Sequence, residues 1–256
     1  MYSKMKKTKT AFITFFPTIP DNMGSSTVVN SRFNSWPYQK KLFQISHIKK
    51  INNKNLKTIF IGKENPLNKI FSLPILIFSV FSYLKSSQNK TIVIEGASWI
   101  FYSFFVFLFL KFLLPNSKII YISHSIESEI RKKFSNTFIY LLTKYLEKLM
   151  FKYVDISTSV SKYEKNKIKK IYNTSTVLYP NAININYKNK KNKIKEDYIF
   201  YSGSYLYKPN KKAIDYLNSN VMPSLLKKYP KLKLVLTGGG FKKKYPWIIN
   251  KKIVQK

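Results

Sequence analysis

The sequence of 256 residues contains no cysteine and only two histidines, His47 and His124. The absence of cysteine excludes disulfide bonds, thiolate metal sites and cysteine nucleophiles. Two histidines are too few for a multi-histidine metal site, so we do not expect one. Hydrophobic residues make up 45% of the chain, which is enough to build a sizeable core.

Arginine is also scarce, because the 46 basic residues include only Arg32 and Arg131. Sequence-specific recognition of nucleic acid relies strongly on bidentate arginine contacts. The formal net charge of +35 therefore does not predict a specific nucleic-acid partner, and we interpret the lysines mainly as solvated surface. A basic, apolar-rich surface is also suited to binding an anionic membrane leaflet, so we keep the membrane surface as a second candidate partner.

The chain has only 11 acidic residues from which a general base or a carboxylate nucleophile could come. We expect Glu147 and Glu164 to be solvated, because both lie on lysine-rich helical stretches. Polar residues at strand ends are better candidates, since open α/β sheets bind ligands at the carboxyl ends of their strands. These candidates are Glu95, His124, Glu127, Glu129 and Asp155.

Two long apolar runs, residues 70–84 and 99–114, fall short of the roughly 20 residues needed to cross a bilayer. We therefore interpret both runs as helices that flank a sheet rather than as segments inserted in a membrane. The apolar run near the N-terminus meets Pro17 too early for a signal-peptide core, so we predict the first strand there.

Apolar strands and helical stretches alternate along the chain, which predicts an α/β fold with a parallel sheet covered on both faces. We expect a first domain at residues 1–183 and a basic linker at 184–196, where apolar residues are nearly absent. Residues 197–256 are expected to form the first part of a second Rossmann-like domain. The strands of the first domain are predicted at residues 10–16, 42–46, 57–61, 91–95, 118–123, 155–160 and 175–178.

The second part opens with a strand–helix–strand unit of the dinucleotide-binding kind. Its first strand reaches Gly203, its helix begins near Lys208, and its second strand ends in the glycines 238–240. We expect a gap of phosphate size after the first strand. The sequence contains no G-x-G-x-x-G and no P-loop pattern, so no motif supports hydride transfer or P-loop nucleotide hydrolysis.

Two positions in the first domain are candidate site residues. His124 directly follows an apolar strand, which places it either at the ligand crevice or at the cap of the next helix. The turn at Gly24 and Ser25 joins the first strand to a helix, so its amides could face an anion. The alternative is that Gly24 serves only its own backbone angle.

Together these segments resemble, in order, the GT-B glycosyltransferases of family 4. The resemblance covers almost the whole chain. In the first domain it rests on the loop through Gly24, on ISHSIESE (residues 122–129), which is similar to the family's H-N-x-E segment, and on YVDISTSVS (153–161), which is similar to D-x-x-x-x-V-S. The segment YPNAIN (179–184) is similar to the P-N-G-V-D crossover into the second domain. Residues 203–210 and 221–223 match the opening of that second domain.

The resemblance implies a retaining transferase that moves a sugar from a nucleoside-diphosphate sugar to a glycan or lipid-linked acceptor, without a metal ion or other cofactor. His124 would lie by the transferred sugar, with Glu127 in a supporting role. Gly24, Ser25, Gly203 and Lys208 would contact the phosphates. Such an enzyme would build bacterial surface polysaccharide or lipopolysaccharide in the cytoplasm, at the inner face of the plasma membrane when its acceptor is a lipid.

The sequence also departs from the family pattern. Ser25 replaces a glycine, Ala182 stands where the crossover usually has glycine, and residues 241–256 contain no acidic residue of the expected E-x7-E segment. We therefore expect a C-terminally truncated donor domain and impaired activity of this chain alone. A non-catalytic remnant or binding module, or a basic membrane-associated protein, remain the alternative functions.

Overall fold

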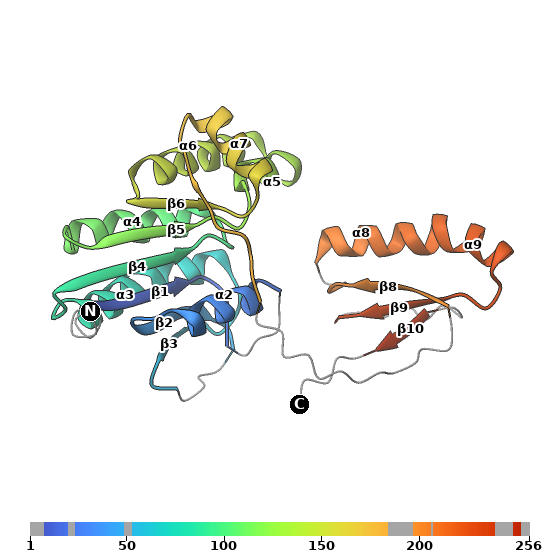
Figure 1. Ribbon diagram of the computed structural model, residues 1–256, viewed down its shortest axis with the longest axis horizontal. Helices are drawn as coiled ribbons and strands as arrows, with labels where there is room; N and C mark the ends of the chain where they lie inside the picture. Colours follow the sequence, from blue (N-terminus) through green and yellow to red (C-terminus); the bar gives the residue numbers. More distant parts are fainter. Residues whose placement is uncertain are drawn as a thin grey trace. The chain divides into compact units, whose positions relative to one another are not determined.

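The structure, a computed structural model, describes residues 8–19, 24–48, 53–183, 197–205, 207–238 and 248–251. The chain divides into two compact units, Met1–Ile185 and Asn186–Lys256, and each unit contains its own sheet (Figure 1). The predicted linker at 184–196 and the glycines 239 and 240 lie outside the described residues.

The first unit is built on a seven-stranded sheet with the strand order β3-β2-β1-β4-β5-β6-β7. All of its strand pairs are parallel, as alternation along the sequence predicts. The strands are β1 (Thr8–Thr14), β2 (Gln39–Ser46), β3 (Leu56–Phe60), β4 (Asn89–Glu95), β5 (Lys118–Ile122), β6 (Ile156–Ser159) and β7 (Val177–Leu178). The predicted α/β fold class is confirmed.

The helices of the first unit follow the strands and begin at recognisable signals. They are α2 (Gly24–Ser35), α3 (Pro66–Leu84), α4 (Ile100–Leu113), α5 (Glu127–Phe134), α6 (Thr137–Tyr153) and α7 (Lys162–Tyr172). The side chains of Asn65, Asn136 and Ser161 accept hydrogen bonds from the first turns of α3, α6 and α7. Asn173, in the left-handed conformation, ends α7.

Alternate residues of the central strand β1 point to opposite faces of the sheet. Ala11 and Ile13 belong to the larger core, which is closed by α3, α4 and α6. Phe12 belongs to a smaller core on the other side, where its ring meets Phe33 of α2 edge-on at 5.3 Å. The two cores explain why β1 is apolar at every position between Ala11 and Ile13.

The two long apolar runs form α3 and α4 beside the sheet, as predicted. Within the described residues, α3 is the one helix long and apolar enough to cross a membrane by length and composition. Its inner side nevertheless packs into the core through Leu73, Leu76 and Val80, which are fully buried. Crossing a bilayer would require α3 to leave that core.

The second unit contains the three-stranded parallel sheet β10-β9-β8. Its elements are β8 (Tyr198–Ser202), α8 (Lys208–Tyr216), a π-helical turn (Leu217–Val221), α9 (Met222–Lys228), β9 (Lys233–Thr237) and β10 (Ile248–Lys251). Ile214 and Met222 pack with Leu234 and Leu236 to form its core. This is the predicted strand–helix–strand unit with one more strand.

Candidate active site

Three side chains from separate segments meet at the carboxyl edge of the large sheet. Glu95 is the last residue of β4, His124 lies just beyond the end of β5, and Arg32 comes from α2. The Nε2 atom of His124 lies 2.7 Å from Oε2 of Glu95. Arg32 donates from Nη1 to both carboxylate oxygens of Glu95, at 2.6 and 2.7 Å. Glu95 therefore joins His124 to Arg32.

The carboxylate of Glu95 is fully buried yet ionised. Burial opposes its ionisation, but the hydrogen bond with His124 and the charge of Arg32 outweigh burial and lower the pKa of Glu95 below its ordinary value. Because an ionised carboxylate only accepts hydrogen bonds, Nε2 of His124 carries the proton. Glu95 thereby holds the ring orientation in which Nδ1 is directed away from the carboxylate.

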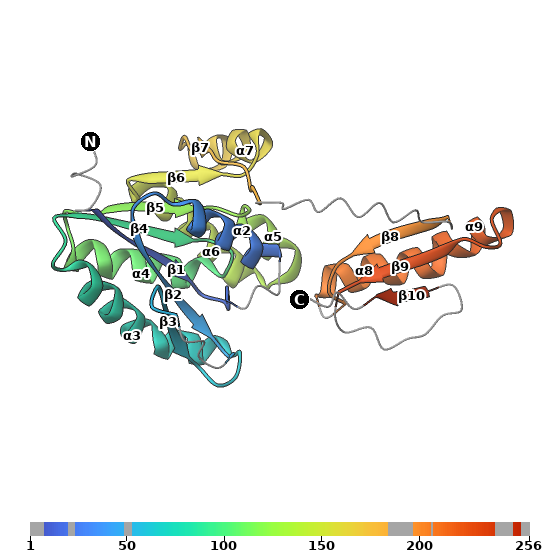
Figure 2. The same cartoon turned by 60° about the horizontal axis from the view of Figure 1, so that its bottom comes forward.

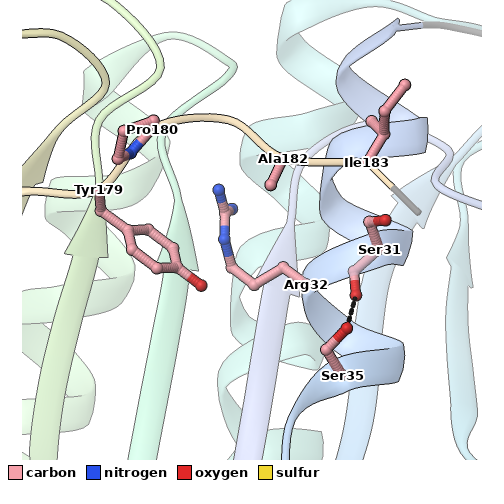
Figure 3. A pocket seen from close by; sticks show the side chains of 7 residues that line it. All are labelled: Ser31, Arg32, Ser35, Tyr179, Pro180, Ala182 and Ile183. Atoms are coloured by element: carbon pink, nitrogen blue, oxygen red, sulfur yellow. Dashed lines mark hydrogen bonds between the residues drawn. The ribbon is translucent and has the colours of Figure 1, made fainter. Parts of the chain in front are cut away.

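A pocket with a volume of about 360 Å³ opens beside Arg32. Arg32 extends from α2 toward Tyr179 and Pro180, and its guanidinium lies 5.0 Å from the centre of the Tyr179 ring (Figure 3). Its Nε atom is buried without a hydrogen-bond partner among the described residues. The lining residues are Ser31, Arg32, Ser35, Tyr179, Pro180, Ala182 and Ile183.

The loop that follows β1 is held in place by side chains from two elements. Oε1 of Gln44 accepts from the backbone amides of Thr18 and Ile19, at 2.8 and 3.1 Å. Ser26 donates to the carbonyl of Pro17, and Asn30 donates to the carbonyl of Thr18. These bonds link the loop to β2 and to α2.

Gly24 begins α2 at an exposed position, with Ser25 half-buried beside it. A Cβ added at Gly24 would meet nothing within 4 Å, and Gly24 does not have a positive φ. Neither its backbone angle nor crowding inside the protein therefore requires glycine at this position. This removes the purely conformational explanation.

His124 does not cap the helix that follows it. The backbone amides of Glu127 and Ser128, in the first turn of α5, donate to Glu147 at 2.7 and 3.1 Å. Tyr172 also donates to Glu147, at 2.6 Å. The expectation that Glu147 is solvated is wrong, because it is fully buried and caps α5 from α6. Burial raises the pKa of Glu147 above its ordinary value.

Glu127 lies near His124 in sequence but is directed elsewhere. Its Oε2 accepts from the backbone amide of Ile100 at 2.6 Å, which caps α4, and its Oε1 accepts from Arg131 at 2.9 Å. Burial raises the pKa of Glu127 to about 7, although Arg131 acts in the opposite direction. Glu127 thus ties the loop of His124 to α4.

In the second unit, Gly203 follows β8 and Lys208 begins α8 in an exposed position. Space beside Gly203 is occupied by Asn210, since an added Cβ would lie 2.7 Å from Nδ2 of that residue. Asn210 donates to the carbonyl of Ser204 and accepts from the hydroxyl of Tyr201. Asn210 therefore links the turn after β8 to α8.

The first unit brings two predicted strand-end residues, Glu95 and His124, into direct contact. Three residues at the site were not expected from the sequence: Arg32, Gln44 and Tyr179. Arg32 could have been noticed as one of only two arginines, but nothing in the sequence places it against Glu95. Within the described part of the chain, no group of three histidine, aspartate or glutamate side chains could hold a metal ion.

No family model and no curated protein sequence matches the chain. Solved structures do match it. A protein named as a UDP-N-acetylglucosamine 2-epimerase from Listeria monocytogenes is 11% identical, with a TM-score of 0.54 over 91% of this chain. An α,α-trehalose 6-phosphate synthase from Burkholderia multivorans is 10% identical, with a TM-score of 0.54 over 93%. WaaG, a glycosyltransferase of lipopolysaccharide biosynthesis, is 11% identical, with a TM-score of 0.53 over 96%.

These likenesses establish that the chain has the GT-B type of Rossmann-like fold. The chain spans 63% of the Listeria protein, 64% of the Burkholderia synthase and 70% of WaaG. At such low identity the fold is what they have in common. They are named as an epimerase, a synthase and a glycosyltransferase, so the fold alone does not determine the reaction.

Proposed function

We propose that this protein is a retaining glycosyltransferase of the family 4 type, acting on a nucleoside-diphosphate sugar and a glycan or lipid-linked acceptor. The observation that carries the proposal is the buried Arg32–Glu95–His124 arrangement beside a pocket at the carboxyl edge of a parallel sheet. Ligands of open α/β folds bind at this edge. The order of motifs in the sequence and the GT-B fold support the same assignment.

In this proposal His124 is the catalytic residue that contacts the transferred sugar. Glu95 keeps Nε2 protonated and the ring oriented, so Nδ1 is the atom left to accept from the sugar. Glu95 is a positioning residue, because it acts through His124. Arg32 also contacts the Glu95 carboxylate, and its charge favours the ionised form.

The leaving diphosphate needs positive charge and N–H donors as its oxygen bond to the sugar breaks. In the first unit we assign this role to the first turn of α2, at Gly24 and Ser25. In the second unit Lys208 at the start of α8 is the proposed phosphate contact, whereas the amide of Gly203 already donates to the carbonyl of Thr237. Helix N-termini favour anions, and no described atom lies within 4 Å of a Cβ added at Gly24. No metal ion or other cofactor takes part in the proposed reaction.

We assign the pocket beside Arg32 to the acceptor. Its walls combine the aromatic ring of Tyr179 with Ser31, Ser35 and Arg32. This mixture of apolar and polar groups suits a sugar, whose ring has apolar faces and hydroxyl groups along its edges. The cytoplasm is the proposed compartment, since nucleoside-diphosphate sugars are the proposed donors. Surface polysaccharide or lipopolysaccharide is the proposed product class.

The test compares the two histidines in the purified protein, supplied with a panel of nucleoside-diphosphate sugars and acceptors. We expect His124→Ala to lower kcat by about 100-fold or more, as loss of a group at the reacting centre does. His47→Ala is the matched control, because His47 is partly exposed and its Nδ1 lies 3.6 Å from the exposed Glu64 carboxylate. Equal rates for the two variants would refute the assignment of His124.

Product analysis by mass spectrometry separates the reactions that share this fold. A larger acceptor with release of nucleoside diphosphate demonstrates transfer. An isomerised nucleotide sugar without an acceptor product would demonstrate epimerisation instead. Saturable binding of donor with no product from any donor would favour the non-catalytic binding module.

A further inference from the structure

Three helices, α3, α4 and α6, cover one face of the large sheet as a continuous layer (Figure 2). Their inner sides close the main core, where Leu76, Val106 and Met150 are fully buried. Soluble proteins usually carry polar residues on the opposite, outward sides of such helices. The outward sides of α3 and α4 are apolar instead, and the outward side of α6 combines apolar residues with lysines.

The exposed residues of α3 form a single stripe. Leu67, Phe71, Ile75 and Phe78 are spaced four, four and three residues apart, which places them on one side of a helix. Phe71 is 75% exposed and Phe78 is 69% exposed. No charged residue interrupts the stripe between Leu67 and Phe78 except Lys69, whose side chain is only 12% exposed.

The neighbouring helices extend this apolar surface. Phe112 of α4 is 83% exposed and Phe138 of α6 is 73% exposed. We call the outward residues of the three helices the apolar helix face. Its exposed members are Leu67, Phe71, Ile75, Phe78, Leu108, Phe109, Phe112, Leu113, Phe138, Leu141 and Tyr145. These residues lie on helices that contact one another, and exposed apolar surface on this scale marks an interaction site.

Charge on the same layer has one sign. Lys144, Lys148 and Lys152 recur every four residues on the exposed side of α6. The only carboxylate in α3, α4 and α6 is Glu147, which is buried. The apolar helix face is therefore bordered by lysines and presents no carboxylate from these helices.

We infer that the apolar helix face docks on an anionic lipid bilayer, with the phenylalanines at the acyl boundary and the lysines of α6 at the headgroups. Amphipathic surfaces with apolar and lysine-rich sides bind in this way. The core contacts of α3 keep it lying along the bilayer rather than crossing it. A second copy of the chain fits less well, because paired faces would bring the lysines of α6 into a shared low-dielectric border.

The inference rests on exposure and charge alone, so its test contains no sugar donor and does not depend on the proposed reaction. The full chain is mixed with vesicles of phosphatidylglycerol and phosphatidylethanolamine, or of phosphatidylcholine alone, and the bound fraction is measured by co-sedimentation. We expect saturable binding to the anionic vesicles and at least about tenfold weaker binding to the neutral ones.

Two sets of variants locate the surface. The triple variant Phe71→Ser, Phe78→Ser and Phe112→Ser should weaken binding at least about tenfold, since it removes apolar area that the bilayer would bury. Phe200→Ser is the control, because Phe200 is 57% exposed but lies on β8 of the other unit. The Phe200→Ser variant should bind vesicles as well as the unsubstituted protein does.

The lysines are tested in the same way. Lys144→Glu with Lys148→Glu should weaken binding about tenfold. Lys165→Glu with Lys169→Glu, the same spacing on the exposed side of α7, should have little effect. Equal losses in both pairs would mean that total charge drives binding, and would overturn the inference.

Two other outcomes would also overturn it. One is absence of binding to anionic vesicles by a chain with a native circular dichroism spectrum. The other is that, without vesicles, the unsubstituted protein is a dimer and the triple phenylalanine variant is a monomer in analytical ultracentrifugation. That result would assign the apolar helix face to a second copy of the chain.

Discussion

Replacement of Glu95 by glutamine is the sharpest test of the candidate active site. Glutamine keeps the shape of the side chain but removes the charge that faces Arg32 and His124. The Arg32 side chain is only 4% exposed, so its charge would remain buried without an anion. Breaking a buried pair in this way costs about 3–5 kcal/mol of unfolding free energy.

That loss is a large part of the total stability of an ordinary domain, about 5–15 kcal/mol. It corresponds to a fall in Tm of roughly 6–20 °C for a unit of this size. Thermal and urea unfolding can be followed by tryptophan fluorescence, since Trp36 and Trp99 both lie in the first unit and are hydrogen-bonded there. The measurement is made at pH 7, where Glu95 is ionised.

A double-mutant cycle separates the pair from simple loss of packing. Arg32→Met removes the cation, and Arg32→Met with Glu95→Gln removes both charges. We expect the double variant to lose clearly less stability than the two single losses combined, because no unpaired charge remains. A loss below about 1 kcal/mol for Glu95→Gln, or simple additivity, would refute the buried charge arrangement.

Acid provides an independent check on Glu95. Its pKa is lowered in the folded state, so its stabilising contribution is present above the ordinary pKa and disappears as the pH falls through the folded value. The parent protein should therefore lose stability below about pH 4.5, and Glu95→Gln should lose less over the same range.

The remaining predictions concern other parts of the two units. Because the pKa of Glu127 is raised to about 7, the folded state keeps the proton on Glu127 to a higher pH than the unfolded state does. The free energy of unfolding should therefore fall as the pH rises from about 4.5 to 7, by on the order of 3 kcal/mol. Glu127→Gln should remove this fall, as measured by urea titrations at several pH values. Gly96→Ala should cost about 1–3 kcal/mol, because the new methyl group would lie 2.5–2.7 Å from the buried Tyr121 ring and hydroxyl, whereas Gly24→Ala should leave Tm nearly unchanged. Gly24→Val should weaken binding of the donor diphosphate at least about tenfold without lowering Tm, and unchanged binding by calorimetry would remove α2 from the phosphate site. Gly238→Ala should destabilise the second unit, because Gly238 has φ of 125° and an added Cβ would collide with the carbonyl of Gly203; a circular dichroism melt of the second unit with no change would contradict it.

Much of the architecture could be predicted from the sequence because it depends on local patterns. The alternation of apolar runs predicted a parallel α/β sheet, and the predicted strand at residues 91–95 has the same last residue as β4 (Asn89–Glu95). Polar residues at strand ends predicted where Glu95 and His124 would lie, since all strands of a parallel sheet end at one edge. These conclusions need only the period of the pattern and the direction of the strands.

The partners of those residues were decided by the tertiary structure. Whether His124 caps a helix or faces Glu95 depends on where Glu147 lies, and Glu147 comes from a lysine-rich helix whose composition indicated exposure. Arg32 reaches Glu95 across 63 positions of the chain, a distance over which no local pattern is informative. Burial of a charged side chain depends on such partners, because only a compensating charge or hydrogen bond makes it favourable.

The same distinction applies to the apolar helices. Their composition determined that α3 and α4 would avoid water, but it could not separate the side that packs on the sheet from the side left exposed. A helix that is apolar on most sides carries little polar pattern to show which side is exposed. Only the packing of α3, α4 and α6 against one another and against the sheet decided that Phe71, Phe78 and Phe112 point outward.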